Sequence, residues 1–109
     1  MEEEKTMEEK NTMEEAGMNQ MNHLTMAWSA ELMLSGDYRA RMAAEWAQVK
    51  IRHRRLQEML DAYREGKLGF EPTCPITLLR EQALVMQEYV DILEKRAELE
   101  DIRLYEYFK

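Results

Sequence analysis

The sequence has few of the residues that break helices or cross-link chains: its 109 residues include one cysteine, two prolines and four glycines. The single cysteine, Cys74, cannot form an intrachain disulfide. Low proline and glycine content argues against turn-rich β-sandwiches and barrels and favours helix. No apolar run approaches the roughly 20 residues that a membrane span requires. We therefore expect one small, all-α domain in the cytoplasm of its cell, with no membrane role.

Basic residues are also in the minority, with 15 Lys and Arg against 22 Asp and Glu and a net charge of −7. Because phosphate contacts require a surplus of Lys and Arg, this balance excludes a sequence-specific nucleic-acid binder and favours a basic partner surface. His23 and His53 lie far apart with no cysteine at ligand spacing, so no metal site is expected. No acid–base or nucleophile–base constellation is present, which predicts a non-enzymatic protein with no cofactor.

The first 22 residues differ in composition from the rest. Seven Glu and two Lys give them about −5 of the net charge, and Thr-Met-Glu-Glu occurs at residues 6–9 and again at 12–15. Their apolar residues are only Met and one Ala, too few to offset the roughly 1–2 kcal/mol per residue that backbone ordering costs. We expect an acidic, disordered tail over residues 1–22, either an arm for a basic groove or a solvated extension. The helical domain then covers residues 23–109.

Three helices are expected in this domain, over residues 25–34, 38–65 and 75–105. Thr25 is placed to cap the first helix, and Ser35 or Asp37 to cap the second. Gly66 tolerates the left-handed conformation that ends a helix. The connection over residues 66–75 holds two Gly and two Pro, so the chain reverses there. The two long helices should form an antiparallel, coiled-coil-like hairpin.

Apolar residues at heptad spacing form one seam on the second helix and two on the third. The second-helix seam is Met42, Trp46, Val49, His53, Leu56, Leu60 and Tyr63. The first seam of the third helix is Leu79, Ala83, Met86, Val90, Leu93 and Ala97, and its second seam is Leu78, Val85, Tyr89, Ile92 and Leu99. A hairpin buries one seam, and the other is a long apolar strip for a soluble monomer. We expect the first helix to cover part of it and a second subunit the rest, in a C2 homodimer with Val85, Tyr89, Ile92 and Leu99 at the interface.

The one basic cluster is Lys50–Arg55, and it has two interpretations. Arg52, Arg54 and Arg55 are candidates for an anion site, because guanidinium groups grip phosphates through forked, charge-assisted hydrogen bonds. Alternatively, the cluster pairs with the acidic third helix across the hairpin. The apolar and aromatic C-terminus, residues 104–108, similarly forms either an interface or a final turn packed against Trp28 or Trp46.

Two stretches, "DYRARMAAEWAQVKIRHRRLQEML" and "LLREQALVMQEYVDILEKR", resemble a family of small helical proteins from gut bacteriophages and prophages, related to a crAss-like phage protein. The matching positions are Tyr38, Arg41, Glu45, Leu56, Leu78, Leu79, Gln82, Met86, Tyr89, Ile92, Leu93 and Arg96. Core packing accounts for several of them. It does not account for Gln82, Tyr89 and Arg96, which share one helix face.

The resemblance implies a phage-encoded antagonist of bacterial immunity, and an anti-CRISPR protein is the main interpretation. Such a protein would bind an RNA-guided nuclease through an acidic face made of Glu88, Asp91, Glu98 and Asp101. A first alternative is an oligomeric sponge that sequesters nucleotide immune signals through Arg52, Arg54 and Arg55. A second alternative is a phage structural or assembly coiled coil.

Overall fold

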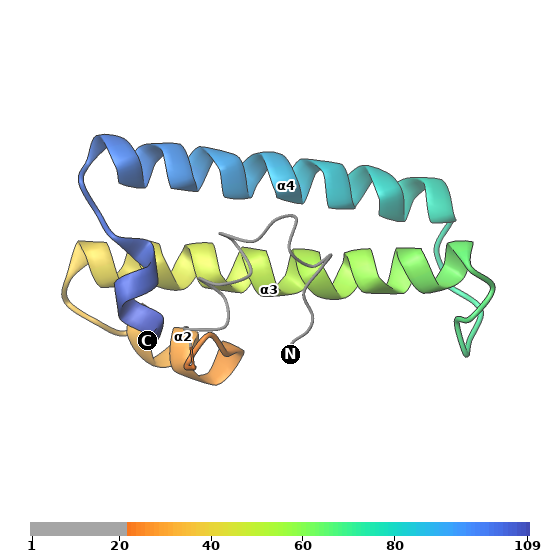
Figure 1. Cartoon of the computed structure of the whole chain (residues 1–109), viewed down its shortest axis with the longest axis horizontal. Coiled ribbons are helices and arrows are strands. Elements are labelled where there is room, and N and C mark those ends of the chain that lie inside the picture. The colour runs from red at the N-terminus through yellow and green to blue at the C-terminus, as the bar shows by residue number, and fades with distance from the viewer. Residues whose placement is uncertain (1–21) are drawn as a thin grey trace, which may run out of the picture.

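The computed structural model describes residues 22–109, which form a long helical hairpin with two short elements packed at one end (Figure 1). The elements are α2 (Met26–Met33), α3 (Tyr38–Arg64), α4 (Ile76–Leu99) and the 3₁₀ helix η1 (Leu104–Phe108). α3 and α4 run side by side in opposite directions (Figure 1). This confirms the all-α fold, the antiparallel hairpin and the short N-terminal helix. The tail expected over residues 1–22 lies, apart from Asn22, outside the described residues.

Local signals in the sequence set where α2 and α3 begin and where α3 ends. The Thr25 hydroxyl accepts a hydrogen bond from the Trp28 backbone N–H at 3.1 Å, and the Asp37 carboxylate accepts one from the Arg39 N–H at 3.0 Å. Each bond satisfies a donor that the first helical turn leaves without an intrahelical partner. Gly66, at φ 72°, ends α3 in the left-handed conformation that glycine adopts without steric cost. These starts and this stop agree with the expected ones.

α4 ends at Leu99, six residues before the expected end at residue 105. Asp101 has φ 58°, and the Ile102 N–H donates to the Ala97 carbonyl at 2.8 Å, a bond that closes the helix. Aspartate enters the left-handed region more readily than most residues other than glycine, because its short polar side chain can hydrogen-bond locally. The chain therefore turns at Asp101 and carries η1 back across α3.

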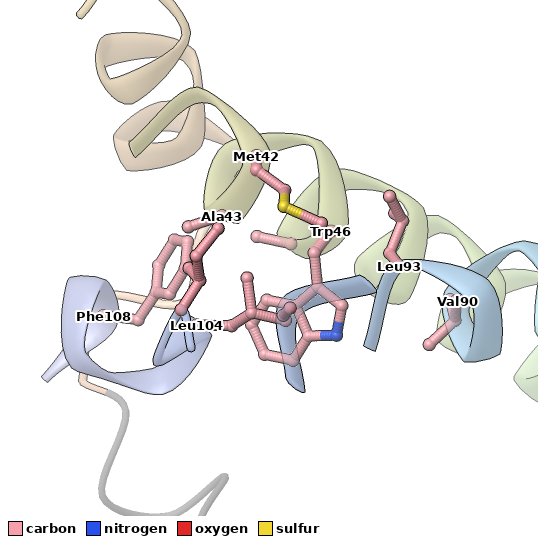
Figure 2. Packing of buried hydrophobic residues seen from close by; sticks show 10 residues of the cluster. Met42, Ala43, Trp46, Val90, Leu93, Leu104 and Phe108 are labelled. Carbon is pink, nitrogen blue, oxygen red and sulfur yellow. The ribbon is translucent and has the colours of Figure 1, made fainter. Parts of the chain in front are cut away.

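The core lies where α3, α4 and the C-terminal segment meet, and Figure 2 shows its side chains converging around Trp46. Trp46 and Phe108 are fully buried, with ring centroids 5.8 Å apart, and the Tyr105 ring meets Trp46 edge-on at 5.3 Å. The Trp46 indole N–H donates to the Glu94 carboxylate at 3.0 Å, so this buried polar group has a partner. Of the two interpretations of the C-terminus, the structure supports the one in which it folds back.

α2 does not cover the second seam of α4, contrary to expectation. It packs against α3 on the side away from α4 (Figure 1), held there by bonds from the Trp28 indole to the Tyr107 carbonyl at 2.7 Å and from the His23 N–H to the Phe108 carbonyl at 2.9 Å. Ala43, Ala44 and Ala47 are fully buried on α3, where their small side chains let neighbouring elements approach closely. The second seam of α4 remains exposed.

Among residues 22–109, none of the helices combines the length and the apolar character that a membrane span needs.

Candidate functional site

An open groove of about 500 Å³ runs between α3 and α4, with Met33 of α2 at its rim. Its volume lies within the range of about 300–1,000 Å³ that is usual for small-molecule sites. The lining residues are Met33, Tyr38, Arg41, Met42, Glu45, Gln48, Val49, Arg52, Tyr89 and Arg96. Two tyrosine rings and three arginines meet in this groove.

Helix periodicity brings the polar lining residues together. Arg41, Glu45, Gln48 and Arg52 follow one another at spacings of four, three and four, which places them along one side of α3. Tyr89 and Arg96 are two turns apart on α4 and face them across the groove. Gln82 continues the same α4 face but does not line the groove. The spacing on α3 is the sequence signal that could have revealed Arg41 and Gln48 as site residues.

Tyr38, Arg96 and Glu100 form a small network at one end of the groove. The Arg96 guanidinium donates to the Tyr38 hydroxyl at 2.8 Å, and that hydroxyl donates to the Glu100 carboxylate at 2.8 Å. The Arg96 Nε lies 3.8 Å from the other Glu100 oxygen. The hydrogen bond to Tyr38 raises the pKa of Arg96 above its ordinary value, and the charge of Glu100 adds to the effect. Arg96 is therefore a fixed cation whose side chain is held in place from two sides.

Tyr89 and Glu45 join the two long helices across the groove. The Tyr89 hydroxyl donates a hydrogen bond to the Glu45 carboxylate. This bond raises the pKa of Tyr89, and burial and the negative charge of Glu45 raise it further. The phenol stays neutral at physiological pH, and its hydroxyl is held by Glu45 beside the groove.

The charges that line the groove are three arginines against one carboxylate, Glu45. The Arg41 guanidinium donates to the Ser35 carbonyl at 2.9 Å, which tethers it to the loop between α2 and α3. Arg52 forms no ion pair with an acidic side chain of residues 22–109, so its donors are available to a ligand. Within the same residues no group of three His, Cys, Asp or Glu side chains could hold a metal ion. The groove is suited to an anion with a planar part.

The family model named Sequestin matches residues 36–99, more than half of the chain. The chain belongs to the Sequestin family. The matched part of the chain contains α3, α4 and all the groove residues except Met33. No curated protein and no solved structure matches the chain. The relation to a crAss-like phage protein and the anti-CRISPR interpretation stay predictions.

The structure separates the three arginines that were predicted as an anion site. Arg52 lines the groove, whereas Arg54 and Arg55 are exposed elsewhere on α3. In the described part of the chain, the expected pairing between the basic cluster and α4 is seen at Lys50, which lies 3.6 Å from Glu94. The pairing interpretation therefore holds for Lys50, and the anion-site interpretation stays a prediction, with Arg52 in the groove.

The acidic residues predicted to bind a nuclease do not belong to the groove. Glu88, Asp91 and Glu98 are exposed on α4, and Asp101 is exposed in the turn that follows. Asp91 accepts a hydrogen bond from Gln87 one turn earlier, at 2.9 Å, an ordinary surface pair. Their role in partner binding stays a prediction. Of the predicted dimer interface, Tyr89 lines the groove, and Val85, Ile92 and Leu99 lie exposed beside it.

Proposed function

We propose that this protein is non-enzymatic and sequesters a nucleotide immune signal by stoichiometric binding in the groove. The family name describes sequestration, which fits the sponge interpretation better than the anti-CRISPR one. The observation that carries the proposal is the convergence of Arg41, Arg52 and Arg96 around two tyrosine rings in a protein that is acidic overall.

A nucleotide has the two chemical parts that this lining recognises. Its phosphate accepts forked, charge-assisted hydrogen bonds from guanidinium groups, and Arg52 is the arginine with donors to spare. Its base is a flat aromatic ring, and stacking of a base on an aromatic side chain contributes about 1–3 kcal/mol. Tyr38 and Tyr89 offer such rings, and both hydroxyls are already fixed by hydrogen bonds. The site therefore needs little reordering to bind.

The distribution of charge removes the objection that an acidic protein should repel a phosphate. The first 22 residues carry about −5 of the −7, which leaves −2 on residues 23–109. The groove lining has three arginines and one carboxylate, Glu45, and with Glu100 beside Arg96 also counted a surplus of one positive charge remains. Because charges beyond about 10 Å are largely screened at physiological salt, the local surplus decides the sign that a ligand meets.

Equilibrium dialysis against AMP, ADP-ribose and cyclic di-AMP, with inorganic pyrophosphate as the phosphate-only probe, tests the proposal. We expect at least one nucleotide to bind stoichiometrically and to be recovered chemically unchanged after the protein is denatured. Arg52→Glu should weaken this binding by about tenfold or more, since it removes a phosphate partner and adds a repelling charge. The matched control is Arg54→Glu, which makes the same charge change on an exposed position of α3 outside the groove.

Two outcomes would contradict the proposal: no binding of any nucleotide, or equal losses for Arg52→Glu and Arg54→Glu. Cleavage of target DNA by guide-loaded Cas9 nucleases in the presence of the protein tests the anti-CRISPR interpretation in parallel. Inhibition that is lost when Glu88 and Asp91 are changed to Lys, in a protein that binds no nucleotide, would establish that interpretation instead. Large filamentous assemblies with neither activity would point to the structural coiled coil.

A further inference from the structure

The exposed face of α4 carries a regular apolar stripe, made of Leu78, Val85, Ile92 and Leu99. These residues recur every seven positions and are 53%, 57%, 58% and 81% exposed. At 1.5 Å per residue the stripe is about 32 Å long. A strict heptad repeat of apolar residues is the pattern that another α-helix packs against.

The charges beside the stripe select the orientation of that partner helix. Glu81 borders the N-terminal half of the stripe, and Lys95 and Arg96 border its C-terminal half. When two copies of α4 pack antiparallel about a twofold axis, Glu81 lies beside the partner's Lys95 at both ends. A parallel pair would instead set Lys95 beside the partner's Arg96. The stripe is thus complementary to its own reversed copy.

One flank of the stripe adjoins the groove, so docking of this partner would also affect the groove. Tyr89 and Arg96 each lie four residues after a stripe residue, so they adjoin the stripe on the helix surface, and both line the groove. A twofold axis perpendicular to an antiparallel helix pair leaves these flanks on the same side of the pair. Both grooves then open on one face, with Tyr89 near the axis beside the partner's Tyr89.

We propose that a second copy of this chain docks antiparallel on the stripe and completes the groove, which is open to solvent in the single chain. Docking stands on the stripe and its charges alone, whereas the completed ligand site rests on the proposed function. The arrangement also brings Glu88 close to the partner's Glu88 near the axis. Removing that one like-charge contact should strengthen the dimer, an effect that a parallel pair would not show.

Sedimentation equilibrium at micromolar concentrations tests the docking. The wild type should have twice the 13.1 kDa chain mass, and Val85→Glu should have the mass of one chain with an unchanged helical circular dichroism spectrum. The matched control is Leu84→Glu, the neighbouring residue, which is 66% exposed but outside the stripe. It should remain dimeric, and Glu88→Gln should dissociate only at lower concentration than the wild type.

A wild type of single-chain mass would overturn the docking, as would equal dissociation by Val85→Glu and Leu84→Glu. A Glu88→Gln variant no tighter than the wild type would overturn the antiparallel orientation.

Equilibrium dialysis with the same nucleotide probes separates the two proposals. A dimer that binds none of them contradicts the proposed function and leaves docking standing, whereas a Val85→Glu monomer that binds as tightly as the wild type contradicts completion of the groove. Binding weakened about tenfold or more in Val85→Glu, and retained in Leu84→Glu, is the expected result.

Discussion

Tyr89 is the residue that the groove and the exposed side of α4 share. Its ring lines the groove, while its hydroxyl is bound to Glu45 on the opposite helix. Resemblance to phage proteins drew attention to Tyr89 and to Arg96, but their partners were not predictable. Glu45 and Tyr38 lie 44 and 58 residues away from them in the chain, and helix periodicity fixes only the face on which each residue lies.

Glu45→Gln should lower the pKa of Tyr89, because it removes the carboxylate that accepts the phenol's hydrogen bond and repels the phenolate. A raised pKa in the folded state means that the interaction stabilises the protonated phenol. Its contribution to folding is therefore complete below the pKa of about 10 of an unfolded tyrosine, and is lost as the pH rises through the higher folded value. Titration of ring-labelled tyrosine by NMR, with Tyr89→Phe to assign the signal, measures the difference.

Glu58→Gln is the control for this titration. Glu58 is an exposed residue of α3, and its substitution makes the same charge change away from Tyr89. An identical Tyr89 titration in the wild type and in Glu45→Gln would show that the Glu45 contact does not form in solution.

At the scale of the elements, α4 has one face buried in the core and another face exposed to solvent. Leu93 is 1% exposed within the core, whereas Leu84 is 66% exposed. Leu93→Ala should lower the free energy of unfolding by about 2–5 kcal/mol, since it removes buried methyl groups and leaves a cavity. Leu84→Ala should change it by about 0.5 kcal/mol or less. Urea denaturation measures both, and similar losses for the two variants would contradict the assignment of the buried face.

The elements also show where prediction from sequence succeeds and where it stops. Ala83, Val90, Leu93 and Ala97 were expected on the buried face of α4, because three–four spacing is a local property of the chain, and all four are buried. The placement of α2 was wrong, since the choice between the two sides of the hairpin depends on the C-terminal segment and its bond to Trp28. The end of α4 was wrong because Asp101 differs from other surface acids only in its backbone conformation.

At the scale of the whole molecule, two features connect the fold to the proposed function. Acidic residues are concentrated in the N-terminal segment, and the apolar stripe of α4 is exposed. Composition alone predicted a basic partner, because it averages an acidic N-terminal segment with a helical domain that is nearly neutral. The groove escaped prediction as a unit because the register of the hairpin, not any single motif, brings Arg41 and Arg52 opposite Arg96. Of the three arginines predicted as an anion site, Arg52 is the one that this register places in the groove.

The thermal stability of the whole molecule should depend on its own concentration. If unfolding separates two docked chains, mass action favours the folded dimer as protein is added, so the Tm rises with concentration. Val85→Glu, which introduces a charge into the stripe, should have a Tm that is lower and independent of concentration. Leu84→Glu should behave as the wild type does. Differential scanning calorimetry over a wide range of protein concentrations measures this dependence, and a wild-type Tm that stays constant over that range would contradict a dimer coupled to folding.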